Sequence, residues 1–452
     1  MRNTVRFSAL MLVLAGVVGC GDDDGTPPPD AGTGDAGPGD AGRPDSGPAG
    51  DGNDSFADAD PLTPGTTATG AIATAGDEDY FSFSGTAGQW VWITTTANPD
   101  DTEGALDTVI TLYDASMTQI AENDDALPRA STDSELITRL PADGTYYLRV
   151  QEYSSWAGDP PVGMSSFTYE LDLAALAGGG AITVDAEGGD DVASAQALGF
   201  TPVTGADIGI LVGTSNDGTD VDVYSFTIVD SRPQAQFTIM PAGTDGYGST
   251  GQPTSLWVTN AAGDEIVARI STTTLAELSP SLPPGDYRLW VGSPASTGTN
   301  AFYVIKPYKL GDNPAETADL TNGLIATPEA LTLSPLDGVP DTDAGYVLAR
   351  LGADDTDHFS FEVAAGDVVS VFCGSRPSGS GVQGLTATVL SADGLTTVGT
   401  STETATTGVE IEEATVAAAG TYVLRLTKTG QDPAVTGDWV RCGVVVGPPA
   451  AP

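Results

Sequence analysis

Positive charge is scarce in this 452-residue chain, where 16 Lys and Arg stand against 62 Asp and Glu for a formal net charge of −46. A surface of this sign repels nucleic acid and anionic lipid headgroups through its long-range field. We therefore expect neither as a partner. The same surface suits divalent cations and basic patches on other proteins.

Histidine is scarcer still, because His358 is the only one. One histidine cannot complete the zinc-binding HExxH motif, and the chain contains neither a G-x-S-x-G nucleophile elbow nor a Gly-rich phosphate loop. Paired carboxylates can hydrolyse glycosides, but 62 acids single out no pair. We expect a protein without enzymatic activity; a hydrolase of an unrecognised type is the least favoured alternative.

Long apolar runs are absent after the first twenty residues, so no transmembrane helix is expected there. At the N-terminus, Arg2 and Arg6 precede an apolar run over residues 9–18 that is too short to cross a bilayer as a helix. This pattern predicts an export signal over residues 1–19.

The run ends in Val17-Val-Gly-Cys20, which resembles the lipobox of bacterial lipoproteins. The resemblance implies cleavage before Cys20 and attachment of a lipid to its sulfur. The alternative is an ordinary secretory signal with a chance cysteine. Gly21 follows, in place of the Asp that retains some lipoproteins in the inner membrane, so the outer membrane or cell surface is favoured. The lipid is the only membrane contact that we expect.

Residues 20–52 lack the apolar side chains that would offset the entropy cost of ordering a chain. After Cys20 they consist almost entirely of Gly, Asp, Pro, Ala, Ser and Thr. We predict a disordered tether with an end-to-end distance of roughly 30 Å. The tether would hold the domains clear of the membrane. The alternative, a neutral filler without that function, would have the same sequence.

One stretch recurs three times, as an acid-x-acid motif that runs into an aromatic segment. The copies are Asp77–Phe83, Asp220–Phe226 and Asp355–Phe361. Each is followed at a nearly fixed distance by a Gly-x-Tyr signal, at Gly144–Tyr146, Gly285–Tyr287 and Gly420–Tyr422. Self-similarity of this kind indicates repeated domains. We predict three of them, over residues 53–176, 184–308 and 311–447.

The segments within each copy are short, alternate between apolar and polar residues, and are interrupted by Gly, Pro, Asn and Asp. This pattern predicts strands rather than helices. The predicted fold class is all-β, with three tandem antiparallel β-sandwiches of jelly-roll type after the tether. Leu140, Gly144 and Tyr146 predict a tyrosine corner, in which the phenol bonds back to the preceding turn, and Tyr287 repeats this signal.

Motifs in the first copy carry a family resemblance. They are Asn53–Ala59, Asp77–Phe83, Ala87-Gly88, Leu106–Tyr113, Asn123–Asp125 and Gly144–Val150. Together they resemble the bacterial pre-peptidase C-terminal domain, a β-sandwich module that is appended to secreted peptidases and to other surface proteins. The resemblance covers residues 53–173, and the second and third copies resemble divergent members. The family's peptidase partner is absent from this chain.

Three cysteines are an odd number, but lipidation of Cys20 leaves a pair. Cys373 and Cys442 each continue the alternation of nearby valines, so both should face a sandwich interior. An oxidising compartment would let them pair. We predict a disulfide that contributes roughly 2–4 kcal/mol; the alternative is two buried free thiols.

The resemblance also implies calcium, because some modules of this family hold it between their first residues and the acids before their first strand. The matching positions are Asp51, Asn53, Asp54, Asp77 and Asp79. Weaker sets are Glu187, Asp190, Asp220 and Asp222 in the second copy, and Asp312, Asp355 and Asp357 in the third. Lys309, where we expect the first acid of the third copy, weakens that site further. The alternative is that these acids cap turns.

Aromatic side chains give a second candidate site. If Val91 and Ile93 face inward, Trp90 and Trp92 share the outward face of their strand, where two indoles can stack on sugar rings or on a partner's side chains. The favoured alternative is that they pack under a loop or against the next domain.

These features predict a non-catalytic, lipid-anchored protein of the bacterial cell surface. Its sandwich modules would bind an extracellular polysaccharide, matrix component or envelope protein, with calcium as a possible stabilising ion. The alternative is a structural envelope protein that acts as a spacer and has no soluble ligand.

Overall fold

The computed structural model describes residues 52–449, except residues 99–103, 127–131, 187, 216–219, 272–275, 293–299, 312–315, 317–320, 337–338 and 405–406. The predicted export signal, lipidated Cys20 and tether therefore lie outside the described residues. No helix in the part of the chain that the structure describes is long and apolar enough to cross a membrane.

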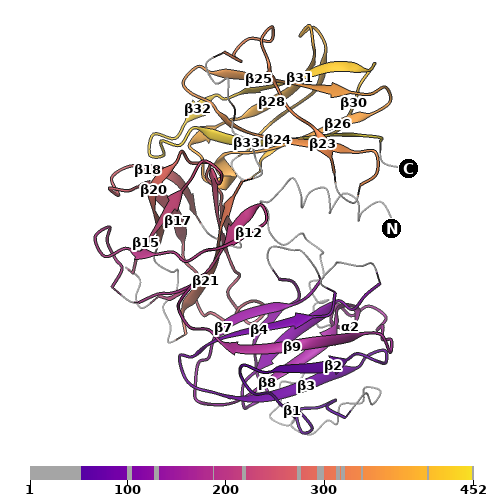
Figure 1. The fold of residues 1–452 in the computed structure, drawn as a ribbon, viewed down its shortest axis with the longest axis vertical. Coiled ribbons are helices and arrows are strands. Elements are labelled where there is room, and N and C mark those ends of the chain that lie inside the picture. The colour runs from indigo at the N-terminus through magenta and orange to yellow at the C-terminus, as the bar shows by residue number, and fades with distance from the viewer. Residues whose placement is uncertain are drawn as a thin grey trace, which may run out of the picture.

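The first sandwich consists of two sheets (Figure 1). One has the order β1-β3-β8-β5-β6, with β1 (Asp60–Pro61), β3 (Glu78–Gly85), β8 (Gly144–Glu152), β5 (Thr108–Tyr113) and β6 (Gln119–Asn123). The other has the order β2-β9-β4-β7, with β2 (Thr67–Ala71), β9 (Thr168–Ala175), β4 (Trp90–Thr96) and β7 (Glu135–Arg139). The short helix α2 (Tyr153–Trp156) follows β8.

The second sandwich repeats the first sheet as β11-β15-β20-β17-β18, with β11 (Gln196–Ala197), β15 (Asp222–Ile228), β20 (Gly285–Val291), β17 (Ser255–Asn260) and β18 (Ile266–Ser271). Its other sheet is centred on the long strand β21 (Phe302–Leu310). The other strands of that sheet are β10 (Ile182–Val184), β12 (Thr201–Val203), β13 (Ala206–Ile208), β14 (Ile210–Thr214), β16 (Gln234–Ile239) and β19 (Ala276–Leu278).

The third sandwich has the first sheet again, as β22-β25-β31-β28-β29, with β22 (Glu329–Ala330), β25 (Thr356–Val363), β31 (Gly420–Thr427), β28 (Thr386–Ser391) and β29 (Thr397–Thr402). Its partner sheet is β23-β24-β33-β26-β30, with β23 (Ser334–Pro335), β24 (Asp343–Arg350), β33 (Trp439–Gly447), β26 (Val368–Gly374) and β30 (Val409–Thr415). The 3-10 helix η1 (Arg376–Ser378) and the pair β27 (Val382–Gln383) and β32 (Gly430–Gln431) complete it.

The same topology recurs because the same signals recur. In each copy, a two-residue strand pairs in parallel with the acid-x-acid strand, which pairs antiparallel with the Gly-x-Tyr strand. The phenols close a tyrosine corner each time: Tyr146 donates to the Ala142 carbonyl at 2.6 Å, Tyr287 to Pro283 at 2.8 Å and Tyr422 to Ala418 at 2.8 Å. The all-β antiparallel fold and the corners at Tyr146 and Tyr287 are confirmed.

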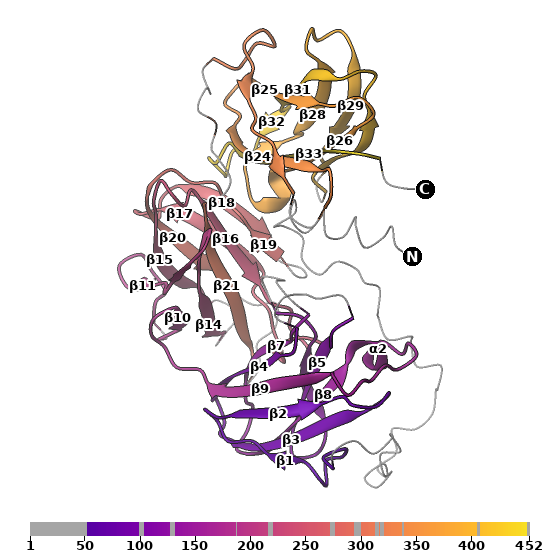
Figure 2. The same cartoon turned by 45° about the vertical axis from the view of Figure 1, so that its right-hand side comes forward.

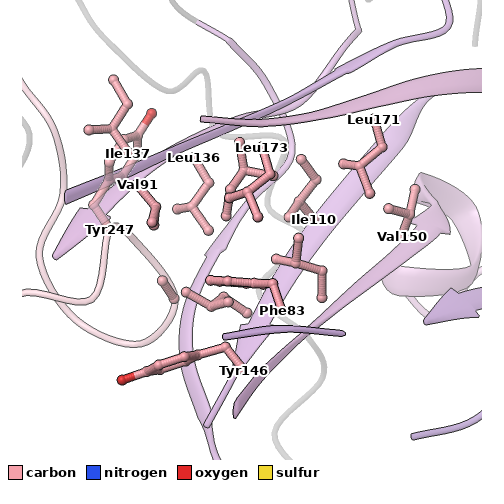
Figure 3. Packing of buried hydrophobic residues seen from close by; sticks show 14 of the residues in the cluster. Phe83, Val91, Ile110, Leu136, Ile137, Tyr146, Val150, Leu171, Leu173 and Tyr247 are labelled. Atoms are coloured by element: carbon pink, nitrogen blue, oxygen red, sulfur yellow. The ribbon is translucent and has the colours of Figure 1, made fainter. Parts of the chain in front are cut away.

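The first two sandwiches share one hydrophobic core. Leu171 and Leu173 point toward Ile110 of the facing sheet, and Tyr247 of the second sandwich enters at the side of this cluster (Figure 3). Tyr247 donates from its hydroxyl to the Glu135 carbonyl at 3.1 Å. The third sandwich has a separate core around the valines of β26 and β33. It lies next to β18 of the second sandwich (Figure 2). The contact includes backbone hydrogen bonds from Arg269 of β18 to the Gly379 carbonyl and from Ser279 to the Ser378 carbonyl.

Candidate metal centres

The acids of the first sandwich meet where the chain enters β3. Asp77 ends the preceding turn and Asp79 lies in β3, and both side chains are buried. Tyr80, the next residue, donates its backbone N–H to the Asn53 carbonyl at 2.9 Å, so the segment with Asn53 and Asp54 runs beside this strand. The structure thus brings together the four predicted residues that it describes. Asp51 lies outside the described residues.

Two observations suit this centre to a cation. Burial and, secondarily, the nearby Asp54 carboxylate raise the pKa of Asp77, so a positive charge at this point would stabilise its ionised form. The Oδ2 atom of Asp77 accepts the Ala73 N–H at 3.1 Å, while its Oδ1 is enclosed and has no hydrogen-bond partner. Converging carboxylate oxygens are the ligands that Ca²⁺ prefers. Asp54 and Asp77 offer such oxygens, but the acids of the first sandwich do not form a group of three within 4.8 Å of one another; among the described residues, only the acids of the second sandwich do.

The second sandwich builds the matching centre from Asp190, Asp220 and Asp222. One carboxylate oxygen from each lies within 4.8 Å of the others. The Gly189 carbonyl accepts the N–H of Val223 at 2.8 Å, as Asn53 does from Tyr80, which places Asp190 where Asp54 stands. Glu187 lies outside the described residues.

A buried tyrosine supports the inner acid in both centres, and the sequence analysis missed it. Tyr169 of β9 donates to Asp79 Oδ2 at 2.5 Å, and Tyr303 of β21 donates to Asp222 Oδ2 at 2.7 Å. Each hydroxyl passes over a glycine: a Cβ on Gly70 would lie 2.3 Å from the Tyr169 hydroxyl, and one on Gly213 would lie 2.2 Å from that of Tyr303. These close approaches require glycine. The sequence signal that could have predicted this arrangement is a Gly-x-x-x-x-x-x-Asp-x-Asp spacing, which both copies share.

Among its described residues, the third sandwich has no acid at the position of Asp54. Its Asn322 carbonyl accepts the His358 N–H at 3.1 Å, so Asn322 matches Asn53, and the next residue is Gly323 rather than an acid. Asp355 instead caps a turn, since its carboxylate accepts N–H groups from Gly352 at 3.2 Å and Thr356 at 2.9 Å. The turn-capping alternative therefore holds for Asp355. Asp357 is buried in β25.

The comparison of Lys309 with an acid of the third copy is wrong. Lys309 belongs to β21 of the second sandwich, where its Nζ lies 3.0 Å from Asp207. The strand ends at Leu310, two residues beyond the predicted end of the second copy. Asp312 lies outside the described residues.

Trp90 and Trp92 do not form an open binding platform, which corrects that prediction. Trp90 is 8% exposed and packs edge-on against Phe302 of the second sandwich, with ring centroids 5.1 Å apart. Trp92 donates its Nε1–H to Glu135 at 2.8 Å. Both indoles project from the predicted face of the first sandwich, but the second sandwich covers that face. The alternative, packing against the next domain, is what the structure shows.

A different aromatic group lies on the first sheet of the first sandwich. The Phe56 ring contacts Tyr80 at 4.7 Å, Tyr113 at 5.1 Å and Tyr147 at 5.4 Å between centroids. Apart from the buried Tyr80, these rings are half-buried, so their outer surfaces reach solvent. We call Phe56, Tyr113 and Tyr147 the tyrosine face. It was missed because Phe56 comes from the segment before β1, far from the other rings in sequence.

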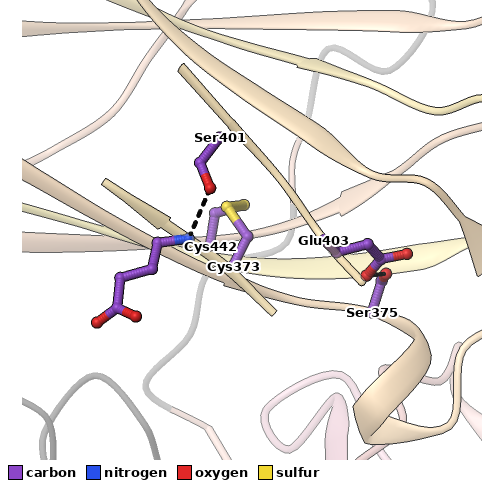
Figure 4. Close-up of a disulfide and its surroundings, with 6 residues drawn as sticks. Cys373, Ser375, Ser401, Glu403 and Cys442 are labelled. Carbon is purple, nitrogen blue, oxygen red and sulfur yellow. Dashed lines mark hydrogen bonds between the residues drawn. A yellow bond between two sulfur atoms is a disulfide. The ribbon is translucent and has the colours of Figure 1, made fainter. Parts of the chain in front are cut away.

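The predicted disulfide is present. Cys373 of β26 and Cys442 of β33 are directly opposite each other and joined by an S–S bond (Figure 4). Both side chains are buried, as the alternation of their strands predicted. Nearby, the Ser375 hydroxyl donates to the Glu403 carboxylate.

Parts of the chain are similar to known proteins. Residues 77–152 match the profile of the bacterial pre-peptidase C-terminal domain. A probable subtilase-type serine protease of Deinococcus radiodurans is 39% identical over 100 residues, which cover 22% of this chain and only 13% of the protease. The pre-peptidase C-terminal domain of a collagenase from Bacillus anthracis is 20% identical over 25% of this chain and 93% of that domain, with a TM-score of 0.19. Residues 77–152, which span β3 to β8, are a bacterial pre-peptidase C-terminal domain.

Proposed function

We propose that this chain is an exported, lipid-anchored binding protein without catalytic activity. In this proposal the first two sandwiches hold calcium, and the first binds an extracellular polysaccharide, matrix component or envelope protein. The match to the pre-peptidase C-terminal domain, a module of secreted proteins, supports export. The lipobox-like sequence before Cys20 supports a lipid anchor at the outer membrane or cell surface.

One observation carries this proposal: the segment with Asp54, the proposed calcium ligand, also supplies part of the tyrosine face. Asp54 lies beside Asp77, and Phe56, two residues on, covers the tyrosines. When bound, calcium would neutralise the repulsion between these carboxylates. Asp54 would then hold its segment against β3 and keep Phe56 in place. Without that neutralisation, Asp54 and Asp77 repel each other and loosen the segment.

The test is a binding array of the purified protein against polysaccharides, collagenous matrix and envelope extracts, with calcium and with chelator. We expect retention that depends on calcium and is lost in Asp77→Asn and in Tyr147→Ala. The exposed Asp159→Asn serves as a matched control and should retain binding. Retention that depends neither on calcium nor on the Tyr147 side chain would contradict the proposal.

A structural spacer is the second candidate, and the shared core of the first two sandwiches favours it. A rigid joint is what a spacer needs, whereas a binding module does not require one. Stable co-purification with envelope proteins, together with no retention on the array by the folded protein, would select this function.

A further inference from the structure

Two tryptophans form one aromatic surface on the outward side of the second sandwich, on the sheet that contains β17, β18 and β20 (Figure 1). Trp257 of β17 and Trp290 of β20 are directly opposite each other, and both point away from the buried core residues of their strands. Their rings are nearly parallel, with an interplanar angle of 13° and centroids 5.6 Å apart. Both side chains are half-buried, so part of each indole reaches solvent.

Contacts with neighbouring groups hold both indoles in position. Trp290 donates its Nε1–H to the Thr259 hydroxyl at 2.9 Å, which fixes the orientation of its ring. Trp257 lies against the backbone at Gly292, where an added Cβ would be 2.9 Å from the indole. A surface whose side chains are already ordered loses little conformational entropy when a ligand packs on it. The tryptophan pair is therefore prepared for binding.

Two arginines border this pair on the same side of the sheet. Arg269 of β18 is exposed and opposite Trp257, and its guanidinium carbon lies 5.9 Å from the centroid of that ring. Arg288 stands two residues before Trp290 on β20, and its Nη1 donates to the Tyr287 carbonyl at 3.0 Å. Among the residues that the structure describes, neither arginine forms an ion pair. Their positive charge is therefore available to a ligand.

We call these four side chains the tryptophan face: Trp257, Trp290, Arg269 and Arg288. Its chemistry selects a ligand that combines apolar ring surfaces with negative charge. Indoles pack against the C–H surfaces of sugar rings, and a guanidinium pairs with a carboxylate through two parallel hydrogen bonds. The net charge of −46 repels an acidic polymer at long range, but salt screens that repulsion beyond about 8 Å under physiological conditions, whereas the arginines act at contact.

We propose that the tryptophan face binds an acidic polysaccharide. Sugar rings pack on the two indoles, the carboxylate of a uronic acid unit pairs with Arg269, and Arg288 adds positive charge beside it. The site lies on the second sandwich, apart from the tyrosine face, and needs no calcium. It therefore goes beyond the proposed function, which places ligand binding on the first sandwich.

Isothermal titration of the purified full chain with oligogalacturonate tests this proposal, in chelator so that the calcium centres make no contribution. The control ligand is the fully methyl-esterified oligomer, which has the same sugar rings without the charge. We expect the acid to bind and the ester to bind about tenfold more weakly. The affinity for the acid should fall as salt is added, because salt screens its pairing with the arginines. The net negative charge alone would give the opposite trend.

Variants of the tryptophan face identify the residues that bind. Trp257→Ala should abolish the binding. Arg269→Gln changes an exposed side chain, so it should fold normally and bind about tenfold more weakly. Arg376→Gln, which removes an exposed arginine of the third sandwich, is the matched control and should bind like the parent.

The inference is overturned if the folded parent does not bind oligogalacturonate, if the ester binds as tightly as the acid, or if Trp257→Ala and Arg269→Gln both bind like the parent. Binding that is lost in Tyr147→Ala but kept in Trp257→Ala would assign the polysaccharide to the tyrosine face and would also overturn it. So would a failure to bind the oligomer combined with co-purification of envelope proteins that Trp257→Ala abolishes, because the face would then dock a protein. Calcium-dependent retention on the array involves the first sandwich, so its failure is distinguishable from each of these results.

Discussion

Lys306 on β21 and Glu135 on β7 form an ion pair that is enclosed between the first two sandwiches, with each side chain 6% exposed. Trp92 donates to the same carboxylate, and Tyr247 bonds the Glu135 backbone. Lys306 and Trp92 therefore converge on one carboxylate from two sandwiches, and Tyr247 binds the backbone carbonyl of the same residue. This convergence ties the polar contacts of the joint to its shared apolar core.

Removing one partner of the Glu135–Lys306 ion pair should lower the unfolding free energy far more than replacing both. Glu135→Ala leaves the ammonium of Lys306 buried without a counter-charge, which costs about 3–5 kcal/mol of unfolding free energy. A Glu135→Met, Lys306→Met double variant should lose much less, because no unpaired charge remains. Urea unfolding measures both. The control is Arg350→Ala, which breaks the exposed pair with Asp438 and should cost under about 1 kcal/mol. Equal losses in the single and double variants would contradict this account.

Local pattern was enough to predict the fold and the disulfide. Side chains alternate between the two faces of a strand, so the phase of the neighbouring valines placed Cys373 and Cys442 inside without any knowledge of the partner sheet. The tyrosine corner at Tyr146 is equally local, because the hydroxyl reaches back only four residues.

Contacts between sandwiches could not be predicted in this way. Alternation gave the correct face for Trp90, but nothing near it in sequence shows that Phe302 covers that face. The electrostatic interaction of Glu277 with Arg441 likewise crosses two sandwiches, and the raised pKa of Glu277 depends on burial that only packing creates. The outer acid of the third copy was misplaced because its register depends on the backbone bond of Asn322.

The effect of Asp77→Asn on the melting temperature should reverse when calcium is added. The folded-state pKa of Asp77 is raised, so its burial as an anion reduces stability at neutral pH when no cation is present. In chelator the variant should therefore melt at a temperature equal to or above that of the parent. In excess calcium the parent should gain stability by mass action and the variant should gain less.

Differential scanning fluorimetry with calcium and with chelator measures this reversal, and Asp159→Asn should follow the parent in both. If Asp77→Asn is destabilising to the same extent in both conditions, Asp77 has a structural role and no calcium is bound there.

The disulfide should stabilise the third sandwich selectively. It joins residues that are 69 positions apart, and its removal in a Cys373→Ala, Cys442→Ala variant should cost about 2–4 kcal/mol. Because the third sandwich has its own core, calorimetry should show one transition moving down while the transition of the first two sandwiches stays in place. A reductant should reproduce the shift in the parent and have no effect on the variant.

Glu277 should make stability fall as the pH rises. Its folded-state pKa is about 8, against an ordinary value of 4.5, so the folded protein binds a proton that the unfolded chain releases between these two values. Unfolding free energy is therefore lost progressively over that range, and no more is lost from this group above pH 8. Glu277→Gln keeps the hydrogen bond with Gln236 available and cannot ionise.

The melting temperature of Glu277→Gln should equal that of the parent below the ordinary pKa of the carboxyl and exceed it above pH 8. Glu329→Gln, at an acid of β22 in the third sandwich, provides the control. A parent and variant whose melting temperatures run parallel across the whole range would show that Glu277 ionises normally.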